Sequence, residues 1–496
     1  MHTAPAFRRL IVCLLLLVSA GCASSHTVPF TLVQLNDVYE IMPLRGGTEG
    51  GLARVATIEK ELRAKNPRTF MMFAGDLFSP SALGTARVDG VPLAGRQIVD
   101  MMNAIGLDYA TFGNHEFDIA HAQFLDRLAE SEFLWVSSNV FDADGRPFPG
   151  VLETHVFDVR GRGNRTVRVG LLGVTMRDNA QDYVRYEEPV AAAVQAARLL
   201  RPSVDVLVAL THLSLEDDVR LAHAAPEIDL ILGGHEHENM QIWRGDTHLI
   251  PITKADANAR TIYIHDLKFD LRSRALEIRS RIQPVDETVA EDPASARLAA
   301  TWVERAYSAF RAQGFEPERI VALSDEVLVA TESAVRNQPT SATHLITAAM
   351  RLEVDDADLS IFNGGNIRMD DVLPAGPVTQ YDVIRLLPFG SNIVSVRMSG
   401  ALLGRVLDQG VANRGTGGFL HYDGVARSEG GLWLVEGQPL SPERVYTVAI
   451  SDYLMSGREV GLDFLTTDAA GVQGSEEKND VRFALIREMQ RRWPQP

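Results

Sequence analysis

The sequence predicts an α/β fold with more than one domain, and three observations lead to that prediction. The chain has 496 residues, which is enough for two or three domains. Apolar residues make up 46% of it and charged residues 23%, an ordinary balance for a globular protein. Apolar runs typical of buried strands alternate with stretches of helical spacing, so we expect a sheet with helices on both faces.

The alternation occupies the first half of the chain. Strands are expected at 30–35, 69–74, 109–112, 167–174, 204–210 and 228–232. Helices are expected at 52–64, 95–105, 124–128 and 190–200. A stretch rich in Ala and charged residues, 287–310, indicates a linker helix, and a second block begins near residue 320.

Polar residues follow these apolar runs in a repeated way. The runs lead to Asp37, Asp76, Asn114, His212 and His235, with His237 close behind. The carboxyl ends of parallel strands gather at one edge of a sheet, so we expect these six side chains to converge. A glycine beside Asp76, Asn114 and His235 lets the backbone bend sharply there.

The chemistry of these six residues favours a metal site. Carboxylate, amide and imidazole donors together suit zinc, manganese or iron better than calcium or magnesium. Each residue alone also fits a structural role, such as a buried Asp at a helix cap or a His in a turn. Their joint placement at strand ends makes coincidence improbable, and Asp76 can bridge two cations. We therefore expect two divalent metal ions, zinc, manganese or similar, which can hold a hydroxide for in-line attack at phosphorus.

The segment 113–118, Gly-Asn-His-Glu-Phe-Asp, adds a candidate acid-base group. Asp118 lies three residues after His115, close enough for its carboxylate to accept a hydrogen bond from the ring. A carboxylate that orients an imidazole is what general acid-base catalysis requires. An isolated Asn-His pair would more often be a solvated turn, but the other motifs favour His115 and Asp118 as catalytic residues.

Residues 1–22 are predicted to be a lipoprotein signal peptide. Arg8 and Arg9 precede an apolar run, 10–18, that is too short to span a bilayer. Ser-Ala-Gly before Cys22 resembles a bacterial lipobox, with ordinary secretion and nearby cleavage as the alternative. The other cysteine, Cys13, lies in the segment to be removed, so the mature chain has no disulfide. We expect an exported protein, lipid-anchored to the bacterial cell envelope on the periplasmic side or the cell surface.

The net charge argues against one class of partner. The formal charge is −17 and the sequence pI is about 5.3. Binding to a nucleic acid polymer needs a basic surface, so we expect none. A small anionic substrate in a locally positive pocket remains compatible with this charge.

The motifs taken together resemble a known family. The order Asn-Asp, Gly-Asp, Gly-Asn-His-Glu, Thr-His and Gly-Gly-His-x-His resembles the calcineurin-like metallophosphoesterases. With Asn-Gly-Gly-x-Ile-Arg at 363–368 and Pro-Phe-Gly at 388–390, the chain is similar to the two-domain 5′-nucleotidase and UDP-sugar hydrolase family from about residue 31 to 464. The resemblance implies a four-layer α/β/β/α metallophosphoesterase domain at 28–286, a linker helix at 287–317 and a C-terminal α+β substrate-binding domain at 318–496.

The resemblance also implies roles for particular residues. One metal site would comprise Asp37, Asp76 and His237, and the other Asp76, Asn114, His212 and His235. His115 and Asp118 match the family's catalytic dyad. In the C-terminal domain, Asn363 and Arg368 match residues that hold ribose or phosphate, and Phe389 and Tyr453 match an aromatic pair that sandwiches the base. Core packing is the alternative for the two aromatic residues.

The chain departs from the family pattern at several positions. Tyr39 stands where the family has the His of Asp-x-His, and a neutral phenol is a poorer ligand than imidazole. The first metal would then be weaker, different in kind or completed by water, with Glu40 nearby. Glu459 stands where the family has an Asp on the ribose. The family's earlier binding arginines have no clear match, and the candidates are Arg351 and Arg385.

The resemblance implies a metal-dependent phosphohydrolase that removes phosphate from nucleoside 5′-monophosphates and related nucleotides. The alternatives are a UDP-sugar hydrolase, a cyclic-nucleotide phosphodiesterase or a thiosulfohydrolase on the same frame, or a non-catalytic nucleotide-binding lipoprotein. We expect a monomer whose partners are a small nucleotide substrate and, through Cys22, the membrane. The metal ligands precede residue 240 and the base and sugar contacts follow residue 320, so the two halves must approach each other for turnover.

Overall fold

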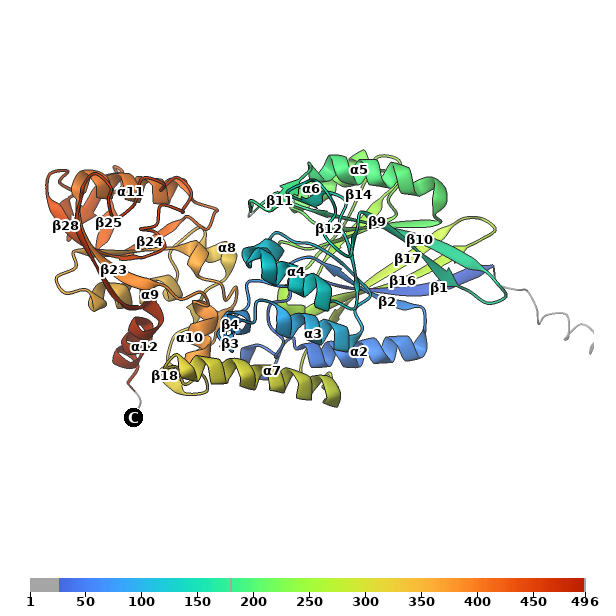
Figure 1. Ribbon diagram of the computed structural model, residues 1–496, viewed down its shortest axis with the longest axis horizontal. Coiled ribbons are helices and arrows are strands. Elements are labelled where there is room, and N and C mark those ends of the chain that lie inside the picture. Colours follow the sequence, from blue (N-terminus) through green and yellow to red (C-terminus); the bar gives the residue numbers. More distant parts are fainter. Residues whose placement is uncertain (1–25, 179–180, 495–496) are drawn as a thin grey trace, which may run out of the picture.

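The computed structural model describes residues 26–178 and 181–494, and Figure 1 shows two halves joined along a long helix. We call residues 26–286 the N-terminal half and 318–494 the C-terminal half. The predicted signal peptide, with Cys13 and Cys22, lies outside the described residues. Within 26–178 and 181–494, every helix is too short or too polar to cross a bilayer.

Two sheets form the centre of the N-terminal half. The strands of the first are β1 (Thr27–Leu35), β2 (Thr69–Ala74), β5 (Tyr109–Thr111), β6 (Leu134–Val136), β8 (Val151–Leu152), β16 (Thr261–Asp270) and β17 (Leu276–Pro284). Their order is β17-β16-β1-β2-β5-β6-β8. The strands of the second are β9 (Thr154–Arg160), β10 (Thr166–Thr175), β12 (Val206–His212), β13 (Leu230–Gly233), β14 (Met240–Arg244) and β15 (Ile250–Lys254). Their order is β14-β15-β13-β12-β10-β9.

The expectation of a single sheet with helices on both faces is wrong. Strands β1, β2, β5 and β6 run parallel in the first sheet, and β10, β12, β13 and β15 run parallel in the second. Each sheet turns one apolar face to the other, where Phe30, Leu32 and Met72 share a buried cluster with Val169 and Val208. Burial of these two faces against each other leaves only the outer faces for helices.

The helices complete a four-layer α/β/β/α arrangement, as the resemblance implied (Figure 1). Those on the side of the first sheet are α2 (Leu52–Lys65), α3 (Arg96–Ile105), α4 (His121–Glu130) and α7 (Pro293–Ala312). Those on the side of the second are α5 (Pro189–Leu200) and α6 (Leu215–Ala224). The helix expected from residue 287 begins at Pro293, because Asp292 caps it by accepting a hydrogen bond from the Ser295 amide.

The C-terminal half is an α+β domain. Its main sheet comprises β20 (Leu359–Asn363), β23 (Asn392–Ser399), β24 (Leu420–Asp423), β28 (Val445–Ser451) and β29 (Val472–Asp480), in the order β24-β20-β28-β23-β29. Its helices are α8 (Glu332–Val335), α9 (Ser341–Glu353), α10 (Gln380–Leu386), α11 (Gly400–Ala412) and α12 (Val481–Arg492). Trp302 of α7 shares one buried cluster with Leu345 of α9 and Leu485 of α12. The helix between the halves is therefore packed into the core rather than exposed as a tether.

Candidate active site

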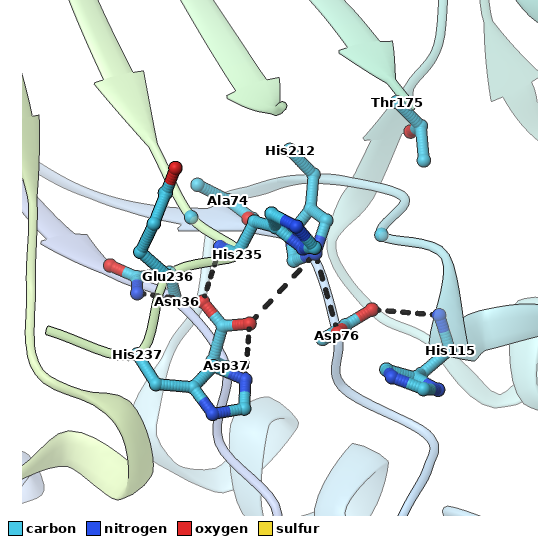
Figure 2. A network of polar contacts seen from close by, with 12 residues as sticks. Asn36, Asp37, Ala74, Asp76, His115, Thr175, His212, His235, Glu236 and His237 are labelled. Carbon is cyan, nitrogen blue, oxygen red and sulfur yellow. Dashed lines mark hydrogen bonds and ion pairs between the residues drawn. The ribbon is translucent and has the colours of Figure 1, made fainter. Parts of the chain in front are cut away.

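The carboxyl ends of the parallel strands of both sheets meet at one edge (Figure 2). The first sheet contributes the residues after β1, β2 and β5, which are Asp37, Asp76 and Asn114. The second contributes the last residue of β12 and the loop after β13, which are His212, His235 and His237. The anionic candidates thus come from one sheet and the imidazoles from the other, so the site exists only where the two sheets face each other.

The backbone at this edge is held in an uncommon conformation. Asp37, Asp76, His235 and His237 have φ angles of 51°, 64°, 89° and 60°. Non-glycine residues in this region are uncommon and often mark functional sites. The predicted role of glycine is only partly correct. Gly75 bends the chain with φ of 85°, but a Cβ on Gly113 would lie 2.1 Å from Asp76 Oδ1, so Gly113 serves close approach instead.

Asp37, Asp76 and His237 form the tightest group of possible ligands. One ligand atom from each lies within 4.8 Å of the others, and His237 Nε2 is 3.3 Å from Asp37 Oδ1. The hydroxyl of Tyr39 reaches into this group. It lies 3.0 Å from Asp76 Oδ2, 3.0 Å from His237 Nε2 and 3.3 Å from Asp37 Oδ1. Tyr39 is therefore part of the site, because its hydroxyl contacts all three possible ligands.

His212 and His235 lie beside Asp76 and Asp37 (Figure 2). His212 Nε2 is 3.3 Å from Asp76 Oδ2 and 3.8 Å from Asp37 Oδ1, while its Nδ1 bonds to the Ala74 carbonyl at 2.8 Å. The ring of His235 packs edge-on against that of His212, with centroids 5.4 Å apart. Asn114 is buried at the end of β5. Asp76 Oδ2 thus lies within 3.3 Å of both His212 Nε2 and the Tyr39 hydroxyl, a position that suits a bridging ligand.

The field of the buried carboxylates favours positive charge. Burial alone would disfavour an imidazolium, yet Asp76 and Asp37 raise the pKa of His212 to about 9. Hydrogen bonds that the His237 ring donates to Asp37 and Asp370 likewise outweigh burial and raise the pKa of His237. Burial and the charge of His212 lower the pKa of His235 to about 3, so His235 is a neutral donor. A pocket that stabilises cations and offers oxygen and imidazole donors fits divalent metal ions.

His115 and Asp118 form the contact predicted from their spacing. His115 Nδ1 donates to Asp118 Oδ2 at 2.6 Å, and the His115 amide donates to Asp76 Oδ1 at 2.8 Å. Burial would lower the pKa of His115, but Asp118 and Asp76 raise it, with Arg368 opposing them. The ring is therefore fixed beside the metal ligands in a form that can hold a proton.

Glu116 is a residue of this site that sequence reasoning passed over. Its carboxylate accepts hydrogen bonds from the amides of Asp76 (3.0 Å) and Phe78 (3.2 Å), and from those of Leu77 and Gly113. These bonds tie the loop after β2 to the loop after β5. Burial, with the charge of Asp76, raises the pKa of Glu116 to about 7. Its position inside the Gly-Asn-His-Glu motif was the only available signal, because backbone donors carry no sequence signature.

Asp370 is a second residue that the sequence did not indicate. It belongs to the C-terminal half, and its Oδ2 accepts a hydrogen bond from His237 Nδ1 at 2.5 Å. The Glu332 amide donates to its other oxygen at 2.6 Å. A carboxylate on the far nitrogen of a ligating His fixes the ring and raises its basicity. One half of the molecule therefore orients a candidate metal ligand of the other half.

We expect Asp370→Ala to weaken metal binding by roughly 10–100-fold, because His237 loses the group that orients its ring. The Asp370→Asn variant retains an oxygen that can accept the same bond, so its loss should be smaller. Titration calorimetry with Zn²⁺ or Mn²⁺ on protein stripped of metal measures the effect. Equal affinity of Asp370→Ala and the parent protein would remove Asp370 from the site.

Phe389, a candidate substrate residue of the C-terminal half, shares a cavity with Asp118 of the dyad. This cavity of about 330 Å³ is lined by Ser79 and Asp118 of one half and by Pro388, Phe389 and Arg482 of the other. This volume is at the lower end of the range for ligand pockets. Phe389 is 49% exposed and Tyr453 37%, which is more than core packing would leave.

Arg368, Asn363 and Glu459 lie with these aromatic residues. The guanidinium of Arg368 is 5.8 Å from the centre of the Phe389 ring. The Asn363 amide donates to Glu459 Oε2 at 2.8 Å, so the Glu that replaces the family's Asp is bonded to the predicted ribose residue. Burial and the charge of Glu459 raise the pKa of Tyr453, while Arg368 acts against them. All four predicted substrate residues therefore belong to one region.

Three residues considered from the sequence have other partners. Glu40 bonds to the Tyr381 hydroxyl at 3.2 Å and pairs with Arg385 at 3.6 Å across the boundary between the halves. This buried pair joins the halves, so Glu40 does not complete the metal site and Arg385 does not serve as a substrate arginine. Arg351 pairs with Asp423 at 3.4 Å and with Glu436 at 3.8 Å, which leaves it engaged elsewhere in the C-terminal half.

Comparison with known proteins agrees with this geometry. The calcineurin-like phosphoesterase family matches residues 30–239, and the 5′-nucleotidase C-terminal domain family matches residues 320–466. The chain belongs to the two-domain 5′-nucleotidase family. As a member it is a metal-dependent phosphoester hydrolase, and its N-terminal half is the metallophosphoesterase domain.

Several relatives of this family can be compared in detail. The chain is 25% identical over 413 residues to the trifunctional nucleotide phosphoesterase protein YfkN of Bacillus subtilis, covering 74% of this chain but 27% of that protein. It is 23% identical over 415 residues to the snake venom 5′-nucleotidase of Naja atra, covering 76% and 75%. The crystal structure of a 5′-nucleotidase precursor from Thermus thermophilus superposes with a TM-score of 0.76 at 21% identity, covering 94% and 97%. The last likeness supports the fold.

Proposed function

We propose that this phosphoesterase removes the phosphate from nucleoside 5′-monophosphates and related nucleotides. The observation that carries the proposal is the position of Arg368. Its charge acts on the catalytic candidate His115 and on Tyr453, and its guanidinium lies beside Phe389. Arg368 can therefore contact a nucleotide whose phosphate lies at His115 and whose base lies at the two aromatic rings. Nucleotide activity is also what the names of the Bacillus and Naja relatives state.

Each side chain has a defined task in this reaction. Arg368 binds phosphate oxygens by charge-assisted hydrogen bonds. His115, whose Nδ1 is held by Asp118, stabilises charge on the departing ester oxygen and supplies its proton from Nε2. Phe389 and Tyr453 stack on the base, and Asn363, bonded to Glu459, contacts the sugar.

The metal ions would be held by the six residues at the strand ends. Asp37, Asp76 and His237 would bind one ion, and the other would be bound by Asp76, Asn114, His212 and His235. When bound, the ions supply Lewis acidity, which neutralises charge on the phosphoryl group and activates water. The buried carboxylates raise the pKa values of His212 and His237, and this preference for positive charge supports the assignment.

We further propose that the protein acts outside the cytoplasm, anchored by a lipid on Cys22 to the bacterial envelope. The short apolar run after Arg8 and Arg9 and the Ser-Ala-Gly-Cys sequence support this location. We expect Cys22→Ser to release the protein from membranes or to block its maturation. Membrane fractionation and acyl labelling measure this, and unchanged results would contradict the anchor.

A hydrolysis screen tests the activity. Purified mature protein, stripped of metal and reloaded with Mn²⁺, Zn²⁺ or Co²⁺, is assayed for product from nucleoside monophosphates, sugar nucleotides, cyclic nucleotides and a thiosulfate ester. We expect the highest kcat/KM with nucleoside 5′-monophosphates. A higher value with another class would assign the pocket to that class, and no turnover with any metal would contradict catalysis.

We expect Phe389→Ala to raise KM for nucleotides by roughly tenfold or more, because about 1–3 kcal/mol of stacking is lost. Hydrolysis of a small aryl phosphate, which reaches the dyad without the rings, should barely change. Trp243→Ala, which removes a comparably exposed ring (47%) from β14, is the matched control and should leave both substrates unaffected. Equal losses with both substrates would make Phe389 a packing residue.

A further inference from the structure

Tyr39 is the position where the candidate metal site departs from the family pattern. Its ring is buried, and its amide donates to Asn258 Oδ1 at 2.9 Å, which fixes the backbone that carries it. Its hydroxyl contacts an atom of each of Asp37, Asp76 and His237. A buried hydroxyl that touches every member of a ligand group requires an explanation.

We propose that Tyr39 is itself a ligand, and that its phenolate oxygen makes this position selective for a hard trivalent cation, of which ferric iron is the natural example. The inference deepens the metal-dependent chemistry proposed above and rests on it for the presence of a cation. It concerns only the site of Asp37, Asp76 and His237, and leaves the site around His212 and His235 to a divalent ion.

The separations of the four donor atoms support ligation. Two atoms bound to one cation at right angles, with bonds of about 2.0–2.2 Å, lie about 3 Å apart. The Tyr39 hydroxyl is 3.0 Å from Asp76 Oδ2 and 3.0 Å from His237 Nε2. It is 3.3 Å from Asp37 Oδ1, the same separation as that between Asp37 and His237. The hydroxyl thus lies as close to all three ligand atoms as Asp37 and His237 lie to each other, as expected of a fourth ligand.

The charge of the buried group supports a trivalent ion. Asp37 and Asp76 are 0% and 1% exposed, and uncompensated charge at such depth is costly. With a phenolate the donors carry three negative charges, and even with the charge of Asp76 shared between two ions, the added phenolate favours a more highly charged cation at this position. Binding replaces the phenolic proton by the cation and releases that proton to water, without any change of oxidation state. Phenolate and carboxylate are hard oxygen donors, which suit a small, highly charged ion.

Absorption and metal content test the proposal without any substrate. Metal-free protein is loaded separately with ferric citrate, Zn²⁺ and Mn²⁺, then freed of excess metal. We expect ferric protein to show a broad visible band from charge transfer between phenolate and iron. Tyr39→Phe should lose the band, while Tyr263→Phe, which alters another buried tyrosine, should keep it. Tyr39→His should shift the ratio of Fe³⁺ affinity to Zn²⁺ affinity toward Zn²⁺ by roughly tenfold or more. Loss of a residue that only hydrogen-bonds to a metal ligand already lowers metal affinity by about that factor.

Three results would overturn the proposal. Iron bound to the parent protein without a visible band would exclude phenolate ligation, as would a band that survives in Tyr39→Phe. A second metal ion bound by Tyr39→Phe but not by the parent would show that the phenol excludes the cation. Circular dichroism and thermal melting of Tyr39→Phe confirm that it folds. The visible band can be measured without any nucleotide. If the protein shows the band but hydrolyses no nucleotide, the proposed function is rejected and this inference stands.

Discussion

Replacing His115 by Ala is expected to lower kcat by roughly 10²–10⁴-fold while the bound metal stays at the parent stoichiometry. The physical reason is that His115 is joined to the metal ligand Asp76 by its backbone amide, which the Ala variant keeps. Its amide donates to Asp76 Oδ1, whereas its ring nitrogen Nδ1 is held by Asp118. Removal of the ring therefore leaves the donors in place and deletes the group that we propose to protonate the departing oxygen.

Two further variants separate this role from others. Asp118→Asn keeps the shape of the dyad but removes the charge that raises the pKa of His115, so kcat should fall less than in His115→Ala and its pH profile should shift. His121→Ala, which deletes an exposed ring stacked on Tyr183, is the matched control and should retain full activity. Stopped assays for kcat and atomic absorption for metal provide both measurements. Loss of metal together with activity would assign His115 to the ligands.

The convergence of the site could be predicted from the sequence because strand ends are a local signal. An apolar run followed by Gly-Asp or Gly-Asn-His needs no knowledge of distant residues, and parallel sheets collect such ends at one edge. Asp76 and His212, 136 positions apart by their numbers, lie 3.3 Å from each other for this reason. The pattern of apolar runs did not reveal the split into two sheets, which only the family resemblance implied, because inner and outer faces of a strand buried on both sides are equally apolar.

The supporting residues could not be predicted for a different reason. Glu116 bonds to backbone amides, and Asp370 reaches His237 from the other half of the molecule. Apart from the place of Glu116 in the Gly-Asn-His-Glu motif, neither contact leaves a signal in the chain. Tyr39 was visible as a departure from the family pattern, but the direction of its hydroxyl required the structure. Lys254 carried no sequence signal at all, so its role also required the structure.

Lys254 is a fully buried lysine at the end of β15. Its ammonium group donates to the carbonyls of Leu213 (2.7 Å) and Gly234 (2.9 Å) and pairs with Asp218 at 2.9 Å and with Glu236. The two carbonyls belong to the loops that follow His212 and precede His235. One cation thus joins the loops that carry the imidazole donors and neutralises the fully buried carboxylate of Asp218.

We expect Lys254→Met to lower the free energy of unfolding by about 3–5 kcal/mol, the usual effect of removing one partner from a buried ion pair. For a domain of this size each kcal/mol shifts Tm by roughly 2–4 °C, so the first calorimetric transition should fall by roughly 6–20 °C. Lys268→Met, which removes a half-exposed lysine paired loosely with Glu277 at 3.9 Å, is the control and should change Tm by about 1–2 °C at most. Adding Asp218→Asn to Lys254→Met removes the orphaned charge and should restore part of the loss. A Tm of Lys254→Met equal to that of the control would contradict this role, because an unpaired carboxylate at 0% exposure has no water to stabilise it.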